Sequence, residues 1–166
     1  MTTKKTAQPD EQQSLSELEL SLTILWNSVK RWMSQRSKEG VLNGLSDLDV
    51  FLMHLLVYRD RQLRANDLAF ALSIDDMHLV SYSLKKLVRV DAITSTKVGK
   101  EVFYKAGPKA KQHYKEFLQD REKFLAPAMK HLSYGDYDIA SLAQLLRALS
   151  GVYEQAARTA ASSKGE

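Results

Sequence analysis

Residues 63–105 read LRANDLAFALSIDDMHLVSYSLKKLVRVDAITSTKVGKEVFYK and carry the most informative pattern of the chain. A short helical pattern comes first, with Leu68, Ala69 and Leu72 on one face, and Ser73 interrupts it. A longer helical pattern follows, whose apolar residues have helical spacing: Met77, Val80, Leu84, Leu87 and Val88. We therefore expect two helices separated by a tight turn.

The second helix has a capping signal at its start, and a hairpin follows its end. Ser73 and Asp76 fit a capping box, because the serine oxygen can accept an orphan backbone N–H and Asp76 is an anion at the positive helix end. Two runs of alternating apolar residues come next, Ala92–Lys97 and Glu101–Lys105, joined by Val98-Gly99-Lys100. Gly99 can supply the positive φ of a tight turn. The predicted fold class is mainly α, a winged helix-turn-helix with a two-stranded β-hairpin wing.

The outer face of the second helix is polar and basic. Burial of the apolar positions leaves six side chains on the other side: His78, Ser81, Tyr82, Lys85, Lys86 and Arg89. Lys97 and Lys100 lie at the hairpin tip. Ordinary solvation of a charged face is the alternative explanation, but a capped helix, a basic face and a basic tip together favour DNA binding.

These residues divide into two predicted roles on double-stranded DNA. Residues toward the N-terminal part of the helix are expected to approach base edges: His78, Ser81, Tyr82 and Lys85. Residues toward the helix end or on the hairpin are expected to hold phosphate or the groove walls: Lys86, Arg89, Lys97 and Lys100.

Composition limits the class of protein. The chain has 166 residues, a net charge of +4 and no cysteine, which excludes disulfides and thiolate metal sites. The basic balance is compatible with a nucleic-acid partner. No apolar run is long enough for a membrane span, and the polar N-terminus is not a secretory signal, so a cytoplasmic protein is expected.

Two helices are expected before the central segment. The first follows a disordered tail, residues 1–13, and runs from Ser14 to about Lys38, with a capping box of Ser14 and Glu17. The second covers Asp47–Tyr58 and is apolar almost all round, which predicts a central, buried helix. Ser46 and Asp49 repeat the capping signal at its start.

Two further helices are expected after the hairpin. Gly107-Pro108 opens a helix that extends to about Leu132, and Pro127 should kink it or end one of its turns. The turn Tyr134-Gly135-Asp136 separates it from a last helix over Tyr137–Thr159. A loose tail, residues 161–166, ends the chain.

The first and last helices carry narrow apolar seams with spacings of three and four. The seam residues are Leu15, Leu18, Leu22, Leu25, Val29 and Trp32 in the first, and Ile139, Leu142, Leu146, Leu149, Tyr153 and Ala156 in the last. An intramolecular bundle could bury them, but a homodimer is favoured, because symmetric dimers are the commonest oligomers. We therefore expect one domain over residues 14–160, with a winged core at about 46–106 and dimerisation helices at about 14–39 and 108–160.

This order of elements resembles the MarR family of bacterial transcription regulators over about Ser14 to Ala160. The matching segments are LSDLDVFLMHLL, RANDLAFAL and SYSLKKLVRVDAI, the last of which resembles the family's recognition helix running into the wing. The resemblance implies a homodimer, a palindromic operator and a small aromatic or phenolic effector. Members usually have a glycine before the first wing strand, where this chain has Asp91, and a longer wing with an Asp-x-Arg motif that this chain lacks.

Other chemistry is not indicated by the sequence. The four histidines show no metal-ligand spacing, His54 is expected to be a partly buried helix residue, and neither catalytic residues nor a cofactor are predicted. Four aromatic residues could line an effector cavity between the first, second and fifth helices, although core packing is the usual role of such residues: Trp26, Phe51, Tyr58 and Tyr114.

The sequence thus predicts a DNA-binding transcription regulator and not an enzyme. The alternative is a winged-helix module that uses the same face to bind a protein partner, because a fold does not fix its function.

Overall fold

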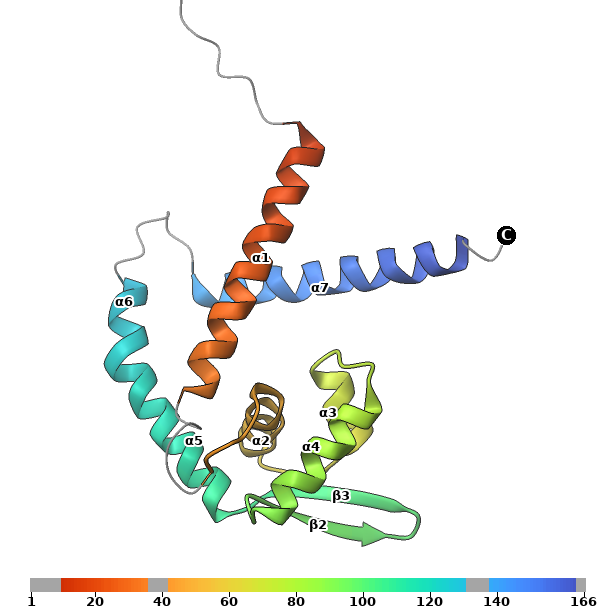
Figure 1. The fold of residues 1–166 in the computed structure, drawn as a ribbon. Helices are drawn as coiled ribbons and strands as arrows, with labels where there is room; N and C mark the ends of the chain where they lie inside the picture. The colour runs from red at the N-terminus through yellow and green to blue at the C-terminus, as the bar shows by residue number, and fades with distance from the viewer. Residues whose placement is uncertain (1–9, 36–41, 131–137, 164–166) are drawn as a thin grey trace, which may run out of the picture. The chain divides into compact units, whose positions relative to one another are not determined.

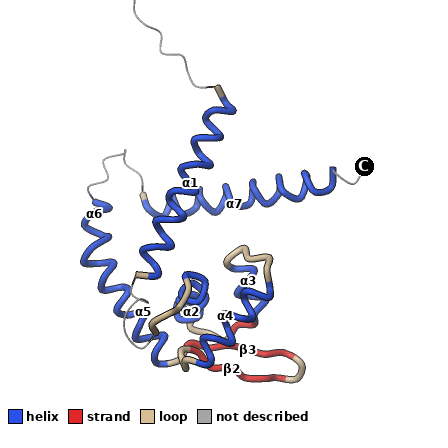
Figure 2. Tube along the Cα trace, viewed as in Figure 1, coloured by secondary structure: helices blue, strands red, loops and turns tan. Residues whose placement is uncertain are grey.

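The computed structural model describes residues 10–35, 42–130 and 138–163. The chain forms two compact units, Met1–Arg121 and Glu122–Glu166. The described part of the first unit contains five helices and a small sheet, and most of the second is helical (Figures 1 and 2). The predicted mainly α fold with a winged helix-turn-helix is confirmed.

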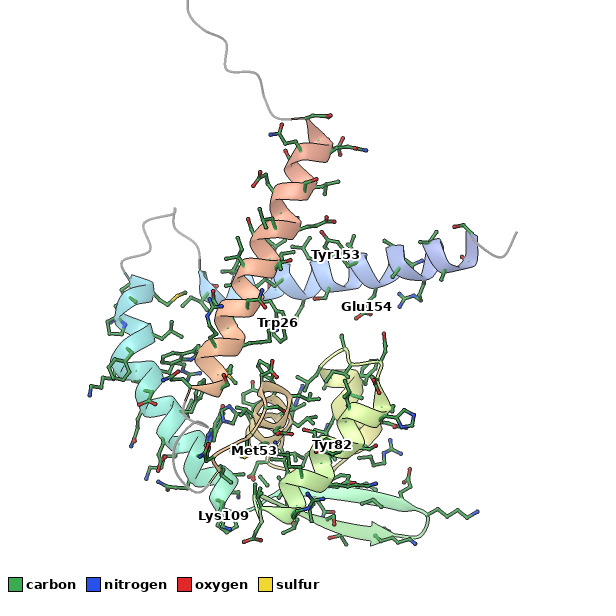
Figure 3. All side chains as sticks on the ribbon, in the orientation of Figure 1. Trp26, Met53, Tyr82, Lys109, Tyr153 and Glu154 are labelled. Atoms are coloured by element: carbon green, nitrogen blue, oxygen red, sulfur yellow. The ribbon has the colours of Figure 1, made fainter. Side chains whose placement is uncertain are left out.

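Helix α2, Asp47–Arg59, lies at the centre of the first unit. Its capping box forms as predicted: the Asp49 N–H donates to Ser46 Oγ at 3.2 Å, and the Ser46 N–H donates to Asp49 Oδ2 at 2.7 Å. Val50, Leu52 and Met53 are fully buried in the hydrophobic core, where Figure 3 labels Met53. Helices α1 and α5, and the helix-turn-helix, pack around this helix.

The helix-turn-helix consists of α3, Ala65–Ala71, and α4, Met77–Arg89. The predicted cap at Ser73 is wrong. Ser73 has a φ of 50° and ends α3, because its N–H donates to the Phe70 carbonyl and the next N–H, of Ile74, donates to the Ala69 carbonyl. Asp76 caps α4 instead, and its carboxylate accepts from the N–H groups of His78 and Leu79.

The wing is the hairpin of β2, Ile93–Val98, and β3, Glu101–Ala106, joined by Gly99-Lys100. Positive φ at Gly99 alone, 61°, is the pattern of a type II′ turn. A two-residue strand, β1 (Leu63–Arg64), pairs with the other side of β3 and makes a three-stranded sheet in the order β1-β3-β2. The sequence analysis missed β1, which is too short to show an alternating pattern.

Asp91 lies between α4 and β2 with a φ of 59°, in the left-handed region. The Asp91 N–H donates to the Val88 carbonyl, and the Ala92 N–H donates to the Leu87 carbonyl, so this residue ends α4 in a conformation that usually favours glycine. Asp and Asn tolerate this conformation better than residues without a short polar side chain.

We expect Asp91→Asn to keep the parent's stability, and Asp91→Ala to lower the free energy of unfolding by about 1 kcal/mol, because alanine is strained at positive φ. Urea denaturation measures both. Asp91 also pairs with Lys109 at 3.4 Å on the surface, and Lys109→Ala is the control for that ion pair. Equal stability of the asparagine and alanine variants would contradict the argument from backbone conformation.

The flanking helices differ from their predicted limits. Helix α1 is Glu11–Ser34 and starts after Asp10, so Ser14 and Glu17 lie inside it and the tail predicted for residues 1–13 is too long. Residues 1–9 and the predicted end near Lys38 lie outside the described residues. Helix α7 is Ile139–Ser162, with Asp138 as its cap, so it extends into the predicted loose tail.

The helix after the wing starts at Pro108, as predicted. Helix α5, Pro108–Asp120, is followed by a π-helical segment, Arg121–Leu125, and by α6, Ala126–Lys130. Pro127 has no N–H and cannot continue a regular hydrogen-bond ladder, which gives the local change in helix type a physical cause. The predicted end at Leu132 and the turn Tyr134-Gly135-Asp136 lie outside the described residues.

Candidate nucleic-acid interface

The outer face of α4 presents a row of side chains to solvent. Val80, Ser83, Leu84 and Leu87 are buried, which turns the opposite face outward. On that face His78, Tyr82, Lys85 and Arg89 are exposed, with Tyr82 at 68% (Figure 3). Ser81 is half-buried at the margin. Helix geometry therefore brings four of the six predicted residues together on one surface.

Leu79, at the flank of this face, is exposed as well and was not predicted. Its side chain is 54% exposed, near the N-terminal end of α4. The sequence analysis treated polar and charged residues as candidates, whereas apolar side chains can contact the methyl group of thymine in a major groove. A helical projection of all residue types, rather than of donors alone, would have included it.

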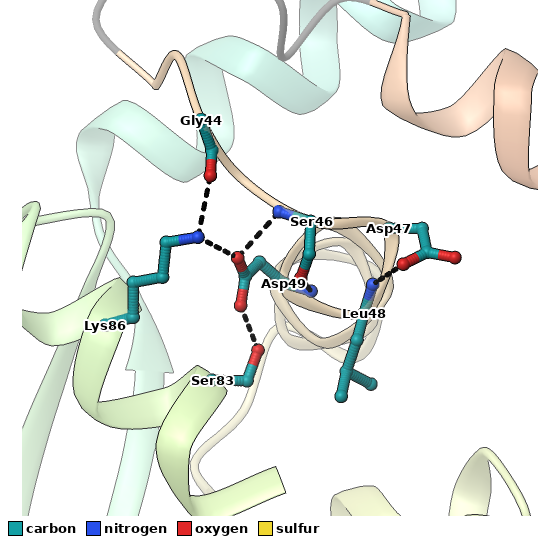
Figure 4. Close-up of polar contacts among 7 residues, drawn as sticks. All are labelled: Gly44, Ser46, Asp47, Leu48, Asp49, Ser83 and Lys86. Carbon is teal, nitrogen blue, oxygen red and sulfur yellow. Dashed lines mark hydrogen bonds and ion pairs between the residues drawn. The ribbon is translucent and has the colours of Figure 1, made fainter. Parts of the chain in front are cut away.

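Lys86 differs from its neighbour Lys85, because it is bound within the protein (Figure 4). Its ammonium donates to Asp49 Oδ2 at 2.7 Å and to the carbonyl of Gly44 at 2.7 Å. Asp49 is buried, with 2% of its surface exposed, and its other carboxylate oxygen accepts from the hydroxyl of Ser83. Burial alone would raise the pKa of Asp49, but the hydrogen bonds from Lys86, Ser83 and Ser46 hold it below its ordinary value.

The tip of the wing carries Lys97 and Lys100, both exposed. Arg64 links α3 to the hairpin near its tip, because its guanidinium donates to Asp67 at 3.0 Å and to Glu101, the first residue of β3, at 2.6 Å. These hydrogen bonds raise the pKa of Arg64, and the bond to Asp67 has the larger effect. Figure 1 shows the β2–β3 hairpin extending past α3 and α4, so the tip cations stand on a part of the wing that projects from the unit.

The four aromatic residues predicted for an effector site have different surroundings. Trp26 stacks on Phe51 with 5.3 Å between ring centroids, and Tyr114 meets the ring of His54 edge-on at 4.9 Å. Tyr58 is 70% exposed, and Arg59 lies over its ring. Three of the four therefore pack on other rings of the first unit, and Tyr58 faces solvent.

A cleft of about 460 Å³ lies between α1 and the start of α2. Its lining residues are Asn27, Lys30, Arg31, Ser34, Leu45, Ser46 and Asp47. The Lys30 ammonium also lies 5.7 Å from the centre of the Trp26 ring, which places the Trp26–Phe51 stack beside the cleft.

Two buried histidines, His54 of α2 and His113 of α5, contact each other. His54 Nε2 lies 3.1 Å from His113 Nδ1, so one ring donates a hydrogen bond to the other. The pKa of His54 is lowered to about 3, mainly because burial disfavours the charged ring and to a smaller extent because His113 lies beside it. His54 is thus more deeply buried than the sequence analysis expected, with 5% of its surface exposed.

No residue of α1 or α7 is fully buried, although Trp32 and Met33 at the end of α1 pack against the first unit. Large apolar side chains on both are exposed: Leu15, Leu20, Ile24, Leu25 and Trp26 on α1, and Ile139, Leu142, Leu145, Val152 and Tyr153 on α7. Apolar stripes of this length on a soluble protein usually mark an interaction surface.

The described residues form neither a metal site nor a membrane span. Residues 10–35, 42–130 and 138–163 hold no group of three or more histidine and acidic side chains that could bind a metal ion. No helix among these same residues has the length and apolar character needed to cross a bilayer.

Comparison with known proteins identifies the domain. Residues 45–110 match the family model of a winged helix DNA-binding domain. No curated protein matches the chain in sequence.

Solved structures identify the fold of the whole chain. The transcriptional regulator BldR from Sulfolobus solfataricus is 14% identical, with a TM-score of 0.63, over 89% of this chain and 99% of that one. A MarR transcriptional regulator from Methanosarcina mazei is 12% identical, with a TM-score of 0.61, over 90% and 93%. FabT of Streptococcus pneumoniae, solved in complex with DNA, is 12% identical, with a TM-score of 0.57, over 87% and 98%. Residues 45–110 therefore resemble a winged helix DNA-binding domain, and the chain has the fold of the MarR transcriptional regulators.

Proposed function

We propose that this protein is a cytoplasmic transcription regulator that binds a palindromic operator in double-stranded DNA as a homodimer. The observation that carries the proposal is the exposed row on α4, beside a basic wing tip, within the matched DNA-binding domain. The similar fold of FabT, which was solved with DNA, supports the same use of this surface. The single domain over residues 14–160 remains part of the proposal.

The position of each residue on the interface determines the type of DNA contact that we propose for it. His78, Tyr82 and Lys85 approach base edges, with Ser81 at the margin and Leu79 as an added apolar contact. Arg89, Lys97 and Lys100 hold phosphates or groove walls, because they lie at the helix end or on the hairpin. Lys86 was predicted to join this second group, but its ammonium donates to Asp49 and to the Gly44 carbonyl within the protein.

Tyr82→Ala and Lys85→Ala should each weaken operator binding by about 1–3 kcal/mol and relax sequence preference at one position. Lys97→Ala and Lys100→Ala should instead weaken all duplexes about equally and lower the salt slope of log K by about one unit per lost contact. Fluorescence anisotropy at several salt concentrations measures both, with an operator obtained by selection from genomic fragments.

Thermal melting is the control for these variants, because a folding defect would imitate lost binding. Parental affinity and selectivity of both α4 variants would show that this helix face does not read DNA. A parent protein that binds no duplex above background at low salt would remove the proposed function as a whole.

The homodimer is proposed from the apolar side chains that the two long helices α1 and α7 leave exposed. A 24-residue helix is about 36 Å long. The apolar stripe along such a helix is large enough to form the interface of a stable dimer. Two copies would present two recognition helices to half-sites about one helical turn apart.

A small aromatic carboxylate is the proposed effector, in the cleft between α1 and the start of α2. Lys30 and Arg31 line this cleft and suit an anion, and the Trp26–Phe51 stack lies beside Lys30. Phenolic carboxylates at about 100 times their Kd should stabilise the protein by roughly 2.7 kcal/mol in thermal-shift assays. Phenol is the uncharged control, and an equal response of the Lys30→Met variant would contradict this site.

A protein-binding module is the second candidate, because the same surface includes exposed apolar residues. Phe70 on α3 is 87% exposed, and Leu79 on α4 is 54% exposed. A protein partner would use such residues as anchors, and its binding would depend only weakly on salt. The steep salt dependence of DNA binding therefore separates the two candidates.

A further inference from the structure

Two adjacent lysines on the recognition helix have opposite surroundings. Lys85 is exposed on the outer face of α4, whereas the side chain of Lys86 is 27% exposed and its ammonium contacts two acceptors of the same chain. These acceptors are the carboxylate of Asp49 in α2 and the carbonyl of Gly44, in the connection that precedes α2. An ammonium with two short internal bonds loses them when it turns to a phosphate.

Resting on the proposed function, we infer that Lys86 and Asp49 are positioning residues, which set the orientation of the recognition helix for the operator, and that Lys86 is not a phosphate contact. This assigns Lys86 a role different from the one that its place on a basic helix face predicts.

The contacts around Asp49 explain how the pair can hold a helix. Asp49 Oδ2 accepts from Lys86 and from the Ser46 N–H, and Asp49 Oδ1 accepts from the Ser83 hydroxyl, so both oxygens are used (Figure 4). Ser83 and Lys86 are three residues apart on α4 and lie on the side that faces α2. Two attachments about one turn apart restrict rotation of the helix about its own axis, which a single attachment would leave free.

The buried charge makes this arrangement sensitive to the loss of either partner. A carboxylate as deeply buried as Asp49 is costly unless it is paired and hydrogen-bonded. Removal of the Lys86 ammonium leaves Asp49 with neutral donors only, so α2 and α4 must shift or admit water. The α1–α2 connection is affected as well, because the Gly44 carbonyl loses its donor.

The experiment compares Lys86→Met with Arg89→Met, a matched variant on the same helix that removes a proposed phosphate contact. For each protein, anisotropy gives the Kd for the selected operator and for a scrambled duplex over a range of salt, and denaturation gives the stability. We expect Arg89→Met to lower the salt slope by about one unit. We expect Lys86→Met to keep the parent's slope on the scrambled duplex and to lower the ratio of operator to scrambled affinity by about tenfold.

A double variant separates positioning from simple loss of stability. Asp49→Asn with Lys86→Met removes the unpaired buried charge, so its stability should recover toward that of the parent. Its operator preference should remain low, because the attachment to α2 and Gly44 is still absent. Lys86→Arg keeps a cation that can donate to both acceptors and should recover part of the preference.

Each contrary result overturns the inference in a recognisable way. A salt slope reduced by about one unit in Lys86→Met would make this residue a phosphate contact. Parental operator preference in Lys86→Met or in the double variant would make the pair purely structural. A parent that binds no DNA would remove the proposed function together with this inference, whereas the other two failures leave DNA binding intact.

Discussion

Leu25→Glu should convert the protein from a dimer to a monomer and lower its operator affinity by about 10²–10⁴-fold. Leu25 lies on the apolar seam of α1 and half of its surface is exposed, so within a proposed dimer interface a glutamate would be buried without a partner. The loss of affinity is large because a dimer binds its second half-site as an intramolecular event, with a gain of about 10²–10⁴ that a monomer lacks.

Sedimentation velocity at micromolar concentration measures the assembly state, and anisotropy measures the affinity. Leu145→Glu should have the same effect from α7, where Leu145 is also exposed. Thr23→Glu is the matched control on α1, because Thr23 is exposed and lies on the opposite side of the helix from Leu25. A monomeric mass for the parent protein would remove the proposed dimer.

Acid should destabilise the protein well before its carboxylates are protonated, because His54 is buried in its neutral form. The pKa of His54 is about 3 in the folded chain and 6.5 in its unfolded reference. The unfolded state therefore binds an extra proton below pH 6.5, and stability falls as the pH falls from about 6.5 toward 3. Between pH 7 and pH 4 this single group accounts for a loss of about 3 kcal/mol.

Urea denaturation between pH 7 and pH 4 measures this effect, and His54→Leu should remove about 3 kcal/mol of the difference between the two pH values. The variant has a lower stability at pH 7, because His113 loses the ring it contacts, so the comparison concerns the pH dependence and not the absolute value. His78→Leu is the control, since His78 is exposed on α4. An unchanged pH dependence in His54→Leu would contradict the burial of a neutral imidazole.

Local signals in the sequence were sufficient for most of the fold. The Ser46 and Asp49 capping box and the start of α5 at Pro108 depend on residues within four positions of one another, and both were predicted. Strand β1 was missed because Leu63 and Arg64 become a strand only through pairing with Tyr104 and Phe103.

The cap of α4 was misplaced for a related reason. Both Ser73 and Asp76 are good capping residues, and the choice between them was decided by the left-handed conformation of Ser73, which ends α3. Nothing in the local sequence indicated that a serine would take the position that usually favours glycine.

The candidate site was predictable in composition but not in the role of each residue. Helical spacing placed Tyr82, Lys85 and Arg89 outside, and they are exposed. It placed Lys86 outside as well, because spacing cannot show that Asp49, 37 positions earlier, lies within 2.7 Å of its ammonium. Apolar Leu79 was overlooked because the search considered only donors and cations.

The bond between Lys86 and the Gly44 carbonyl bears on how the specificity of such proteins can be exchanged. A recognition helix that is cut from this chain and inserted into a related scaffold would carry a lysine whose acceptors stay behind. Chimeras that exchange only Met77–Arg89 would therefore acquire the contact residues without their alignment. The portable unit for specificity design in this protein is the helix together with the segment from the Gly44 turn to Asp49, two pieces that are separate in the sequence and joined only in the fold.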